Sequence, residues 1–351
     1  MSIVLPEHRL CVAPMMERTD RHCRYLLRLI APRAWLYTEM VTARALVHGD
    51  RARLLRFDAL EHPVALQIGG SEPAELAAAA RWGEEAGYDE INLNVGCPSG
   101  RVQAGCFGAA LMREPERVAE CVAAMGASVH VPVTVKTRLG VDDHDSYEFL
   151  HTFARQVVDA GCGTLIVHAR KAWLKGLSPK QNREIPPLDY ARVYRLKGDF
   201  PRTEIVINGG LSDAAVTRAQ WSHVDGVMLG RAAYDEPMLM AEIDALAYSE
   251  TRTAAEGRSD MAERAHVLER YLRYAEREVD AGTRLNAMTR PLAGMYAREP
   301  GGRAWRRELS LLPDGSAGLR QLRRLVAEHG ERACMRHREV ATITHSTFHP
   351  N

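Results

Sequence analysis

The stretch EINLNVGCPSGRVQAGCFG, residues 90–108, holds a cysteine at a point where chemistry is expected. An apolar, strand-like run ends at Asn94, and Gly96, Cys97 and Pro98 follow closely. Such a cysteine can be inert core, half of a disulfide, a metal ligand, a nucleophile or a proton donor. The seven cysteines form no C-x-x-C pair and no Cys/His run at zinc spacing, which argues against a disulfide framework and a structural metal.

Polar residues and glycines also follow the other apolar runs of the chain. A single Lys or Arg at such a point is usually solvated, and a single His is usually a satisfied core residue. The informative feature is that polar residues and glycines recur at the carboxyl ends of successive predicted strands. In a TIM barrel the active site is built from the residues at these ends. The set is Pro14, Met15 and Met16; Glu39; Gln67; Asn94 and Cys97; Lys136 and Arg138; His168 and Arg170; Asn208, Gly209 and Gly210; Gly230 and Arg231.

The elements that must position these residues are eight apolar runs of strand length, most of them separated by helical patterns that end in glycine. Eight alternating units predict an α/β protein with a (β/α)8 TIM barrel, whose typical length is about 250 residues. A doubly wound open sheet is the alternative, but it would normally show a G-x-G-x-x-G turn after its first strand, which this sequence lacks. The runs are residues 9–14, 34–39, 63–68, 90–95, 131–136, 164–169, 204–209 and 225–230.

The ends of the seventh and eighth runs indicate an anion site. The sequences INGGLSD and MLGRAAYDEP place glycines where backbone N–H groups can approach an anion closely, with Arg231 beside them. The loops after strands 7 and 8 are the usual phosphate site of TIM barrels. We therefore expect a phosphorylated ligand at Asn208 to Gly210 and Gly230 to Arg231.

A second domain follows the barrel. We assign residues 1–247 to the barrel, 248–260 to a polar linker, 261–335 to a small C-terminal helical domain and 336–351 to an aperiodic tail. Residues 251–351 hold 18 Arg, no Lys and 13 acidic residues, whereas the whole chain has a net charge of only +1. This asymmetry by itself is weak support for a polyanionic partner.

The composition is that of an ordinary soluble globular protein. Hydrophobic residues make up 46% of the chain and charged residues 26%. The amino terminus lacks the basic and apolar regions of a signal peptide, and no run reaches the roughly 18 apolar residues of a membrane span. We expect a cytoplasmic protein that does not enter a membrane.

These motifs together resemble the tRNA-dihydrouridine synthase family, whose members carry FMN in a TIM barrel and hold tRNA with a helical domain. The resemblance covers about residues 9 to 330. Within the family the chain is most similar to the A branch, which modifies nucleotides 20 and 20a in the D-loop of tRNA. The stretches that carry the resemblance are APMMERTDRHCRYLLR, QIGG, NVGCPSGRVQAGCFGAALM, VTVKTRLG, VHARKAWLKGLSPKQNREIPPLDY, INGG and GVMLGRAAY.

The resemblance implies a set of flavin contacts. The FMN phosphate would lie at the two glycine turns, and the ring would lie against the backbone of Pro14 to Met16. A lysine near the pyrimidine side of the ring would stabilise the anionic reduced flavin. The implied cofactor residues are Pro14, Met15, Met16, Gln67, Lys136, His168, Asn208, Gly209, Gly210, Gly230 and Arg231.

The resemblance also gives the thiol of Cys97 a role. Reduction of uridine to 5,6-dihydrouridine needs a hydride at C6 and a proton at C5, with NADPH as the source of electrons. An ordinary cysteine thiol titrates at a pKa of about 8.5, so at neutral pH it carries the proton that a general acid needs. Asn94 and Arg138 would hold the uracil.

The target base in folded tRNA is stacked and must be swung out, which costs a few kcal/mol. Basic and aromatic side chains in RKAWLKGLSPKQNR and PGGRAWRREL would offset this cost. By similarity to the A branch, Lys180, Arg183, Arg303 and Arg306 would set the orientation of the tRNA. One departure is visible: Ala110 stands where many members carry a second cysteine, and Cys106 lies nearby. No metal is implied.

Three other functions stay open at this point. The chain could be an FMN-dependent reductase or dehydrogenase of a free pyrimidine. It could be a Schiff-base barrel lyase that uses Lys136 as its nucleophile. It could also bind tRNA without redox chemistry. Yellow colour of the purified protein would separate the flavin-dependent functions from the other two.

Overall fold

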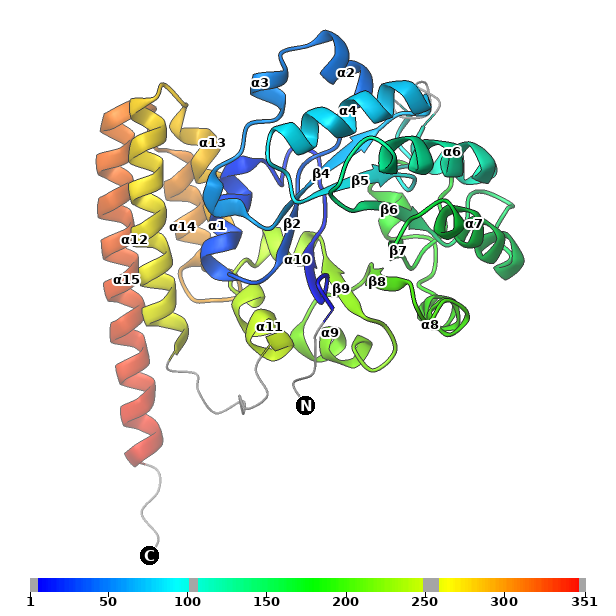
Figure 1. Ribbon diagram of the computed structural model, residues 1–351. Helices are drawn as coiled ribbons and strands as arrows, with labels where there is room; N and C mark the ends of the chain where they lie inside the picture. Colours follow the sequence, from blue (N-terminus) through cyan, green and yellow to red (C-terminus); the bar gives the residue numbers. More distant parts are fainter. Residues whose placement is uncertain (1–5, 101–106, 249–258, 347–351) are drawn as a thin grey trace, which may run out of the picture. The chain divides into compact units, whose positions relative to one another are not determined.

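The structure is a computed structural model that describes residues 6–100, 107–248 and 259–346, with side chains described from 263 to 332 in the last range. Eight parallel strands form a closed barrel, which confirms the predicted TIM barrel (Figure 1). The hydrogen-bonded order is β2-β1-β9-β8-β7-β6-β5-β4, and β2 also pairs with β4 to close the ring. The strands are β1 Leu10–Val12, β2 Trp35–Tyr37, β4 Val64–Gly69, β5 Glu90–Asn94, β6 Val133–Arg138, β7 Thr164–His168, β8 Glu204–Asn208 and β9 Gly226–Leu229.

Each predicted apolar run overlaps one of these strands. Six strands lie within their runs and are shorter, whereas β4 and β6 end one and two residues beyond theirs. An additional two-residue strand, β3 Val41–Thr42, pairs with the end of β4. The registers place the polar ends of neighbouring strands beside one another: Asn94 pairs with Lys136, and His168 pairs with both Arg138 and Asn208. The barrel therefore gathers at one edge the residues that the sequence separates by more than a hundred positions.

Helices follow the strands and lie outside the ring (Figure 1). Side-chain caps begin several of them, because the oxygens of Ser146, Asp189 and Asp213 accept the N–H groups of the first helical turn. Gly87 and Gly161 have φ of 95° and 107° just after α4 and α7, as expected for C-terminal glycines. The helices are α1 Arg21–Ile30, α2 Ala43–His48, α3 Arg51–Leu54, α4 Pro73–Glu85, α6 Pro115–Gly126, α7 Tyr147–Asp159, α8 Tyr190–Asp199, α9 Ala214–Gln220, α10 Arg231–Asp235 and α11 Leu239–Tyr248.

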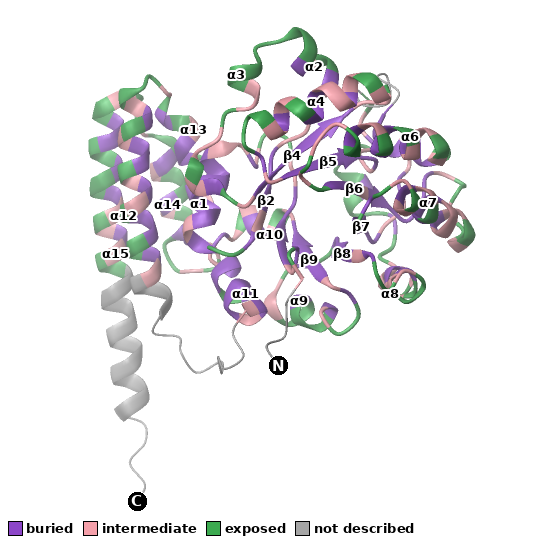
Figure 2. Ribbon diagram, in the orientation of Figure 1, coloured by how far each residue is buried: buried purple, intermediate pink, exposed green. Residues whose placement is uncertain are grey.

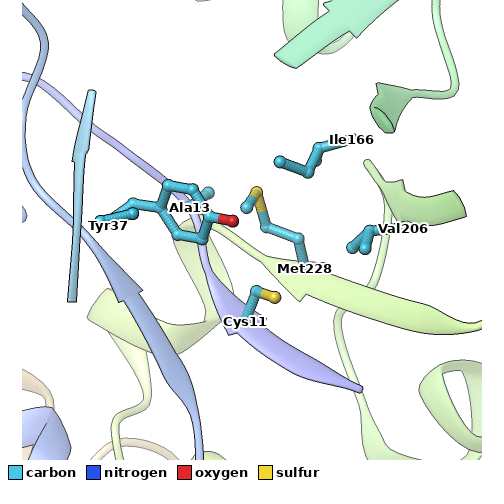
Figure 3. Close-up of a cluster of buried hydrophobic side chains, with 7 residues drawn as sticks. Cys11, Ala13, Tyr37, Ile166, Val206 and Met228 are labelled. Atoms are coloured by element: carbon cyan, nitrogen blue, oxygen red, sulfur yellow. The ribbon is translucent and has the colours of Figure 1, made fainter. Parts of the chain in front are cut away.

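Part of the barrel interior is a cluster of buried apolar side chains. Figure 3 shows them converging from β1, β2, β7, β8 and β9. The cluster consists of Cys11, Ala13, Tyr37, Ala65, Ile166, Val206 and Met228. The strands are coloured as buried almost throughout in Figure 2, whereas the helices around them carry exposed residues. A filled interior of this kind is a packed core that fixes the strand ends in place.

The chain divides into two compact units, the barrel with residues 1–24 and 33–232 and a second unit with residues 25–32 and 233–351. The division places α11 in the second unit, whereas the sequence analysis assigned residues up to 247 to the barrel domain. The second unit has a buried aromatic centre, in which Tyr25 and Tyr274 stack at 3.8 Å and the buried Trp305 donates from Nε1 to the carbonyl of Leu292 at 2.7 Å. Its remaining helices are α12 Ser259–Asp280, α13 Leu285–Thr289, α14 Gly302–Ser310 and α15 Gly315–Ser346.

The helical character of the second unit agrees with the sequence analysis, but α15 continues to Ser346, where an aperiodic tail from residue 336 was expected. The expected linker at 248–260 lies largely outside the described residues, and α12 begins at Ser259. Short 3-10 turns are η1 Ala59–Glu61, η2 Gly108–Arg113, η3 Gln181–Arg183 and η4 Pro291–Gly294. In the described part of the chain, no helix combines the length and the hydropathy that crossing a bilayer would need.

Candidate active site

Cys97 lies in the loop after β5 and is held there through its backbone. The side-chain oxygen of Asn94 accepts hydrogen bonds from the N–H groups of Gly96 and Cys97, at 3.2 and 3.0 Å. The carbonyl of Cys97 accepts from the N–H of Ala109 at 2.9 Å. The thiol is free and half-buried, unlike the buried thiols of Cys11, Cys23, Cys121 and Cys162. Among the cysteines whose surroundings are described, Cys97 is thus the one suited to meet a substrate.

Arg138 ties the Cys97 loop to the segment after β7. Its Nε donates to the carbonyl of Gly96 at 2.9 Å, and its Nη1 donates to the carbonyls of Lys171 and Asn182, each at 3.1 Å. The sequence analysis expected Arg138 to help hold the uracil. Three of its five donors bind backbone carbonyls, and the two N–H groups of Nη2 are left for a ligand. Burial lowers the pKa of Arg138 to about 10.

Lys136 reaches across the barrel end from β6 to β8. Its Nζ donates to Asn208 Oδ1 at 3.1 Å, and Asn208 Nδ2 donates to the carbonyl of Met228 at 2.7 Å. Burial lowers the pKa of Lys136, and the nearby charge of Arg138 lowers it further, to about 7. Lys136 is therefore only partly protonated at neutral pH, and an anionic ligand would favour its charged form.

His168 ends β7 and is buried. Burial lowers the pKa of His168 well below its usual value, and the charges of Arg138 and Lys136 add to the effect. The imidazole is therefore neutral, and its buried Nδ1 has no hydrogen-bond partner in the described structure. The ring packs against Gly209, where a Cβ would lie only 3.2 Å from two ring atoms.

The turn after β8 requires glycine at both positions. Gly209 and Gly210 have φ of 107° and 72°, a region that L side chains rarely adopt. A Cβ on Gly210 would lie 2.4 Å from Leu188 Cδ1, and the hydroxyl of Tyr190 donates to the carbonyl of Gly209 at 2.8 Å. Gly230 is half-buried after β9, and the exposed Arg231 pairs with Glu184 at 2.7 Å.

The loop after β1 is braced by a buried ion pair. Thr19 accepts the N–H of Met15 on its hydroxyl at 2.8 Å, and its own carbonyl accepts from Arg24 Nη1 at 2.8 Å. Arg24 pairs with the fully buried Glu61 at 2.6 Å. Pro14 and Met15 are half-buried on this loop, and the Met16 side chain is 59% exposed. A large exposed apolar side chain next to polar strand ends is suited to contact a ligand.

Gln67 and Asn94 are joined directly. Asn94 Nδ2 donates to Gln67 Oε1 at 2.9 Å, and the N–H of Gln67 donates to the hydroxyl of Thr38 at 2.9 Å. Both side chains are buried, at 1% and 8% exposure. The predicted cofactor residue on β4 and the predicted substrate residue on β5 therefore share one hydrogen bond.

The segment after β7 is organised by a buried amide. Asn182 is fully buried, accepts the N–H of Trp173 at 2.7 Å and donates to the Trp173 carbonyl at 2.9 Å. Its Nδ2 also lies 3.3 Å from the carbonyl of Leu177. Lys180 and Arg183 flank this amide and are exposed. Burial lowers the pKa of Arg183, and the positive charges of Arg231 and Arg18 lower it further. Several cations therefore gather around this segment.

Arg303 and Arg306 lie on α14 in the second unit, and both are exposed. They belong to a different compact unit from Lys180 and Arg183. The assignment of these four residues to tRNA binding stays a prediction. Cys106, whose role the sequence left open, lies outside the described residues.

The residues of the barrel end fit an anionic, phosphorylated cofactor. Two consecutive glycines of positive φ at the end of β8, the cations Lys136 and Arg231, and the His168 ring, whose Nδ1 has no partner among the described residues, form a set suited to a polar ligand. Within the ranges that the structure describes, no group of three or more His, Cys, Asp or Glu side chains could hold a metal ion.

Sequence reasoning missed several contributors to this site. Asn182 follows no predicted strand, and only its burial reveals its role. Glu39 had no assigned role; its side chain accepts the N–H of Glu17, a residue with φ of 62°. Burial raises the pKa of the Glu39 carboxyl. Arg18 contributes positive charge beside Arg183. A signal was present only for Glu39, which ends the second apolar run.

Comparisons with known proteins agree with this geometry. The family model described as dihydrouridine synthase (Dus) matches residues 11–329. Proteins named tRNA-dihydrouridine(20/20a) synthase are similar over most of the chain. The one from Xanthomonas campestris pv. campestris is 56% identical over 302 residues, which are 86% of this chain and 88% of that protein. The one from Vibrio cholerae is 54% identical and covers 86% and 90%. The one from Escherichia coli strain K12 is 52% identical and covers 86% of each. The chain therefore belongs to the dihydrouridine synthase family.

Proposed function

We propose that this protein reduces uridine to 5,6-dihydrouridine in the D-loop of tRNA, at nucleotides 20 and 20a, with FMN as cofactor and NADPH as reductant. The names of its relatives support the reaction and the nucleotide positions. One structural observation carries the proposal: a free, half-buried thiol is held by its backbone at the carboxyl end of a barrel strand, next to a buried amide. We place the reaction in the cytoplasm.

Cys97 acts as the proton donor in this proposal. Its thiol gives a proton to C5 of the uracil, and the resulting thiolate takes a proton back from solvent. When bound, FMN supplies the hydride that reaches C6. A thiol that starts in its protonated form needs no neighbouring base, in contrast to a nucleophilic cysteine.

The residues of the barrel end would hold the flavin. Gly209 and Gly210, with Gly230 and Arg231, would bind its phosphate through backbone N–H groups and a guanidinium. Lys136 would provide a cation at the pyrimidine side of the ring. Pro14, Met15 and Met16 would lie against the ring, and Gln67 and His168 would contact its edge. The turn conformation and the donor set described above support these assignments.

Asn94 and the Nη2 group of Arg138 would orient the uracil. Both side chains are anchored within the barrel unit, so they can hold the base without first becoming ordered. The exposed Lys180 and Arg183 on the barrel unit and Arg303 and Arg306 on the helical unit would bind the tRNA backbone. In this proposal the barrel is the catalytic domain and the helical unit binds tRNA.

The Schiff-base alternative uses the lowered pKa of Lys136, which would suit an amine nucleophile. The same property suits a cation that is charged by its ligand, and family membership favours the second role. Treatment of the protein with borohydride and a carbonyl substrate should therefore trap no adduct on Lys136.

The replacement Cys97→Ala tests the proposal. Dihydrouridine formation should fall by about 10²- to 10⁴-fold, the usual contribution of a general acid, while FMN binding and NADPH oxidation stay intact. Product is measured by mass spectrometry of digested tRNA, with flavin absorbance and NADPH absorbance followed in parallel. Cys121→Ala, which removes a thiol from α6 outside the barrel, is the matched control and should keep the activity of the unmodified protein. Full product formation by Cys97→Ala would contradict the role of the thiol.

A further inference from the structure

A chain of buried side-chain hydrogen bonds runs through the barrel from the Cys97 loop to residues at the amino-terminal ends of the strands. It begins at the N–H of Cys97 and ends at His8, which precedes β1. All its side chains belong to the barrel unit. Its members, with their exposed fractions, are Asn94 at 8%, Gln67 at 1%, Asn92 at 0%, Thr134 at 1%, Glu90 at 0% and His8 at 2%.

Each link of the hydrogen-bond chain lies within normal bonding distance. Cys97 N donates to Asn94 Oδ1 at 3.0 Å, and Asn94 Nδ2 donates to Gln67 Oε1 at 2.9 Å. Gln67 Nε2 donates to Asn92 Oδ1 at 2.8 Å, and Asn92 Nδ2 donates to the Thr134 hydroxyl at 2.8 Å. The hydroxyl of Thr134 donates to Glu90 Oε1 at 2.5 Å. Every link therefore donates in the same direction, toward Glu90.

The groups at the two ends of this hydrogen-bond chain fix the direction of donation. At one end the N–H groups of Gly96 and Cys97 can only donate, so the Asn94 atom that faces them must be its oxygen. At the other end the Glu90 carboxylate can only accept. The four members between the ends, three amides and one hydroxyl, can each both donate and accept. A reversal at either end would set two donors or two acceptors against each other in a buried site, which is costly.

His8 holds the Glu90 end in place. Its Nε2 lies 2.5 Å from Glu90 Oε2, and its Nδ1 lies 2.6 Å from Glu204 Oε2. Burial alone would lower the pKa of His8, but the hydrogen bonds and charges of Glu204 and Glu90 outweigh burial and raise it to about 10. The imidazolium therefore donates to both carboxylates, and Glu90 is left with acceptor atoms for Thr134.

The direction of the chain decides which atoms Asn94 and Gln67 offer to a ligand. The Gln67 oxygen accepts from Asn94, and each amide nitrogen uses one of its two N–H groups within the chain. One N–H on each amide has no further partner in the described part of the protein. A pyrimidine ring and the corresponding edge of a flavin present two carbonyl oxygens on either side of an N–H group. The free amide N–H groups match the carbonyl oxygens, which an amide oxygen at the same place would repel.

We propose that Glu90, held by His8, is a positioning residue that acts through Thr134 and Asn92 to orient the amides of Gln67 and Asn94 as donors toward the flavin and the uracil. This inference rests on the proposed function, because it assigns those two amides to the same site. The inference adds Glu90 to the residues that shape the site, although Glu90 lies at the opposite end of the barrel and touches neither the flavin nor the uracil.

The test compares variants that interrupt the chain with a variant that leaves it whole. Thr134→Val has nearly the same shape and removes the hydroxyl, whereas Thr134→Ser keeps it. Glu90→Gln offers an N–H where the chain needs an acceptor. Glu204→Gln is the matched control, because Glu204 binds the same imidazole but is not a link between His8 and Thr134. Thermal melting first identifies the variants that fold.

The readouts are the dissociation constant for FMN from fluorescence quenching, the absorption bands of the bound flavin, and the KM for tRNA. Thr134→Val and Glu90→Gln should each weaken FMN binding and raise the KM about tenfold, which corresponds to ~1.4 kcal/mol, and should shift the flavin bands. Thr134→Ser and Glu204→Gln should match the unmodified protein within about twofold. The double variant Glu90→Gln/Thr134→Val should be no worse than Thr134→Val, because both changes break one chain.

Equal effects of Glu90→Gln and Glu204→Gln would overturn the inference, since Glu90 would then matter only as a partner of His8. Unchanged flavin bands and KM in a folded Thr134→Val variant would overturn it as well, even if Glu90→Gln did not fold. Failure of the proposed function gives a different result: the unmodified protein would bind no FMN or would form no dihydrouridine.

Discussion

The barrel interior holds two buried regions that are built by opposite means. In the apolar cluster of Figure 3, side chains such as Ile166, Val206 and Met228 make contacts that have no preferred direction. In the hydrogen-bond chain, each side chain from Asn94 to Glu90 needs a particular partner at a particular atom. The side chains of both regions are almost completely buried. Burial alone therefore does not distinguish residues of the packed core from residues that orient the site.

One strand contributes to both regions, and its neighbour contributes only to the hydrogen-bond chain. On β4, Ala65 belongs to the apolar cluster and Gln67, two residues later, belongs to the chain. On β5, Glu90, Asn92 and Asn94 recur with a period of two and all belong to the chain. Because alternate residues of a strand point to the same face, β5 lines the interior with polar groups where a barrel usually carries branched apolar ones. The comparison teaches that one strand can carry a directional network while its neighbours supply ordinary packing.

The largest expected effect comes from removing an end of the hydrogen-bond chain. Glu90→Leu leaves the His8 charge without one of its carboxylates and Thr134 without an acceptor. We expect the free energy of unfolding, measured by urea denaturation, to fall by about 3–5 kcal/mol. Ile166→Val in the apolar cluster removes one methylene and should cost about 0.5–1.5 kcal/mol. If both variants lost a similar amount of unfolding free energy, the hydrogen-bond chain and the apolar cluster would not differ in how they tolerate substitution.

An intermediate effect should appear in the pH dependence of FMN binding. The pKa of Lys136 is lowered to about 7, and a bound anion favours its charged form, so binding takes up a proton. Below about pH 7 the lysine is already charged and affinity is at its plateau. Above that pH the affinity should fall, by at most about tenfold per pH unit. The phosphate is a dianion throughout this range, because its second pKa is about 6.

Fluorescence titrations of FMN between about pH 7 and pH 9 measure this dependence. The variant Lys136→Met should bind FMN weakly at every pH and lose the slope. An equally steep slope in Lys136→Met would assign the titration to another group. A flat profile in the unmodified protein would mean that the ligand does not rely on the charge of this lysine.

The smallest expected effect comes from a volume-conserving change in the apolar cluster. Met228→Leu should cost less than about 1.5 kcal/mol of unfolding free energy, because packing without direction tolerates a similar shape. The absorption bands of the bound flavin should not change. A spectral shift in this variant would show that the apolar cluster also positions the site, and the two regions would no longer be separable.

The barrel could be predicted from the sequence because its signal is local and repeated. Each buried strand appears as an apolar run such as residues 164–169 or 204–209, and its polar end appears beside it. Parallel pairing then brings Asn94 beside Lys136 and His168 beside Asn208, as the registers have it. The positions of the candidate site residues at one edge follow from topology and need no knowledge of side-chain contacts.

The partners within the site could not be predicted in the same way. Three donors of Arg138 bind carbonyls of two segments that are distant in sequence, the Cys97 loop and the segment after β7, and no sequence pattern predicts such contacts. The link of His8 to Glu204 spans 196 residues and depends on closure of the ring. The sequence also did not predict that α11 belongs to the second unit. Its helical pattern follows that of the barrel helices without a break, so its assignment depends on tertiary packing.

The buried amide of Asn182 has a consequence for the tRNA binding that we propose. It closes the segment from Trp173 to Ser178 upon itself, so the neighbouring Lys180 and Arg183 extend from a pre-shaped base. A loop that must first become ordered loses conformational entropy when it binds, and that loss weakens the complex. Here much of the loss has already occurred during folding. In the proposed function the segment would therefore meet the tRNA backbone as a rigid edge, and more of the electrostatic attraction would be retained as affinity.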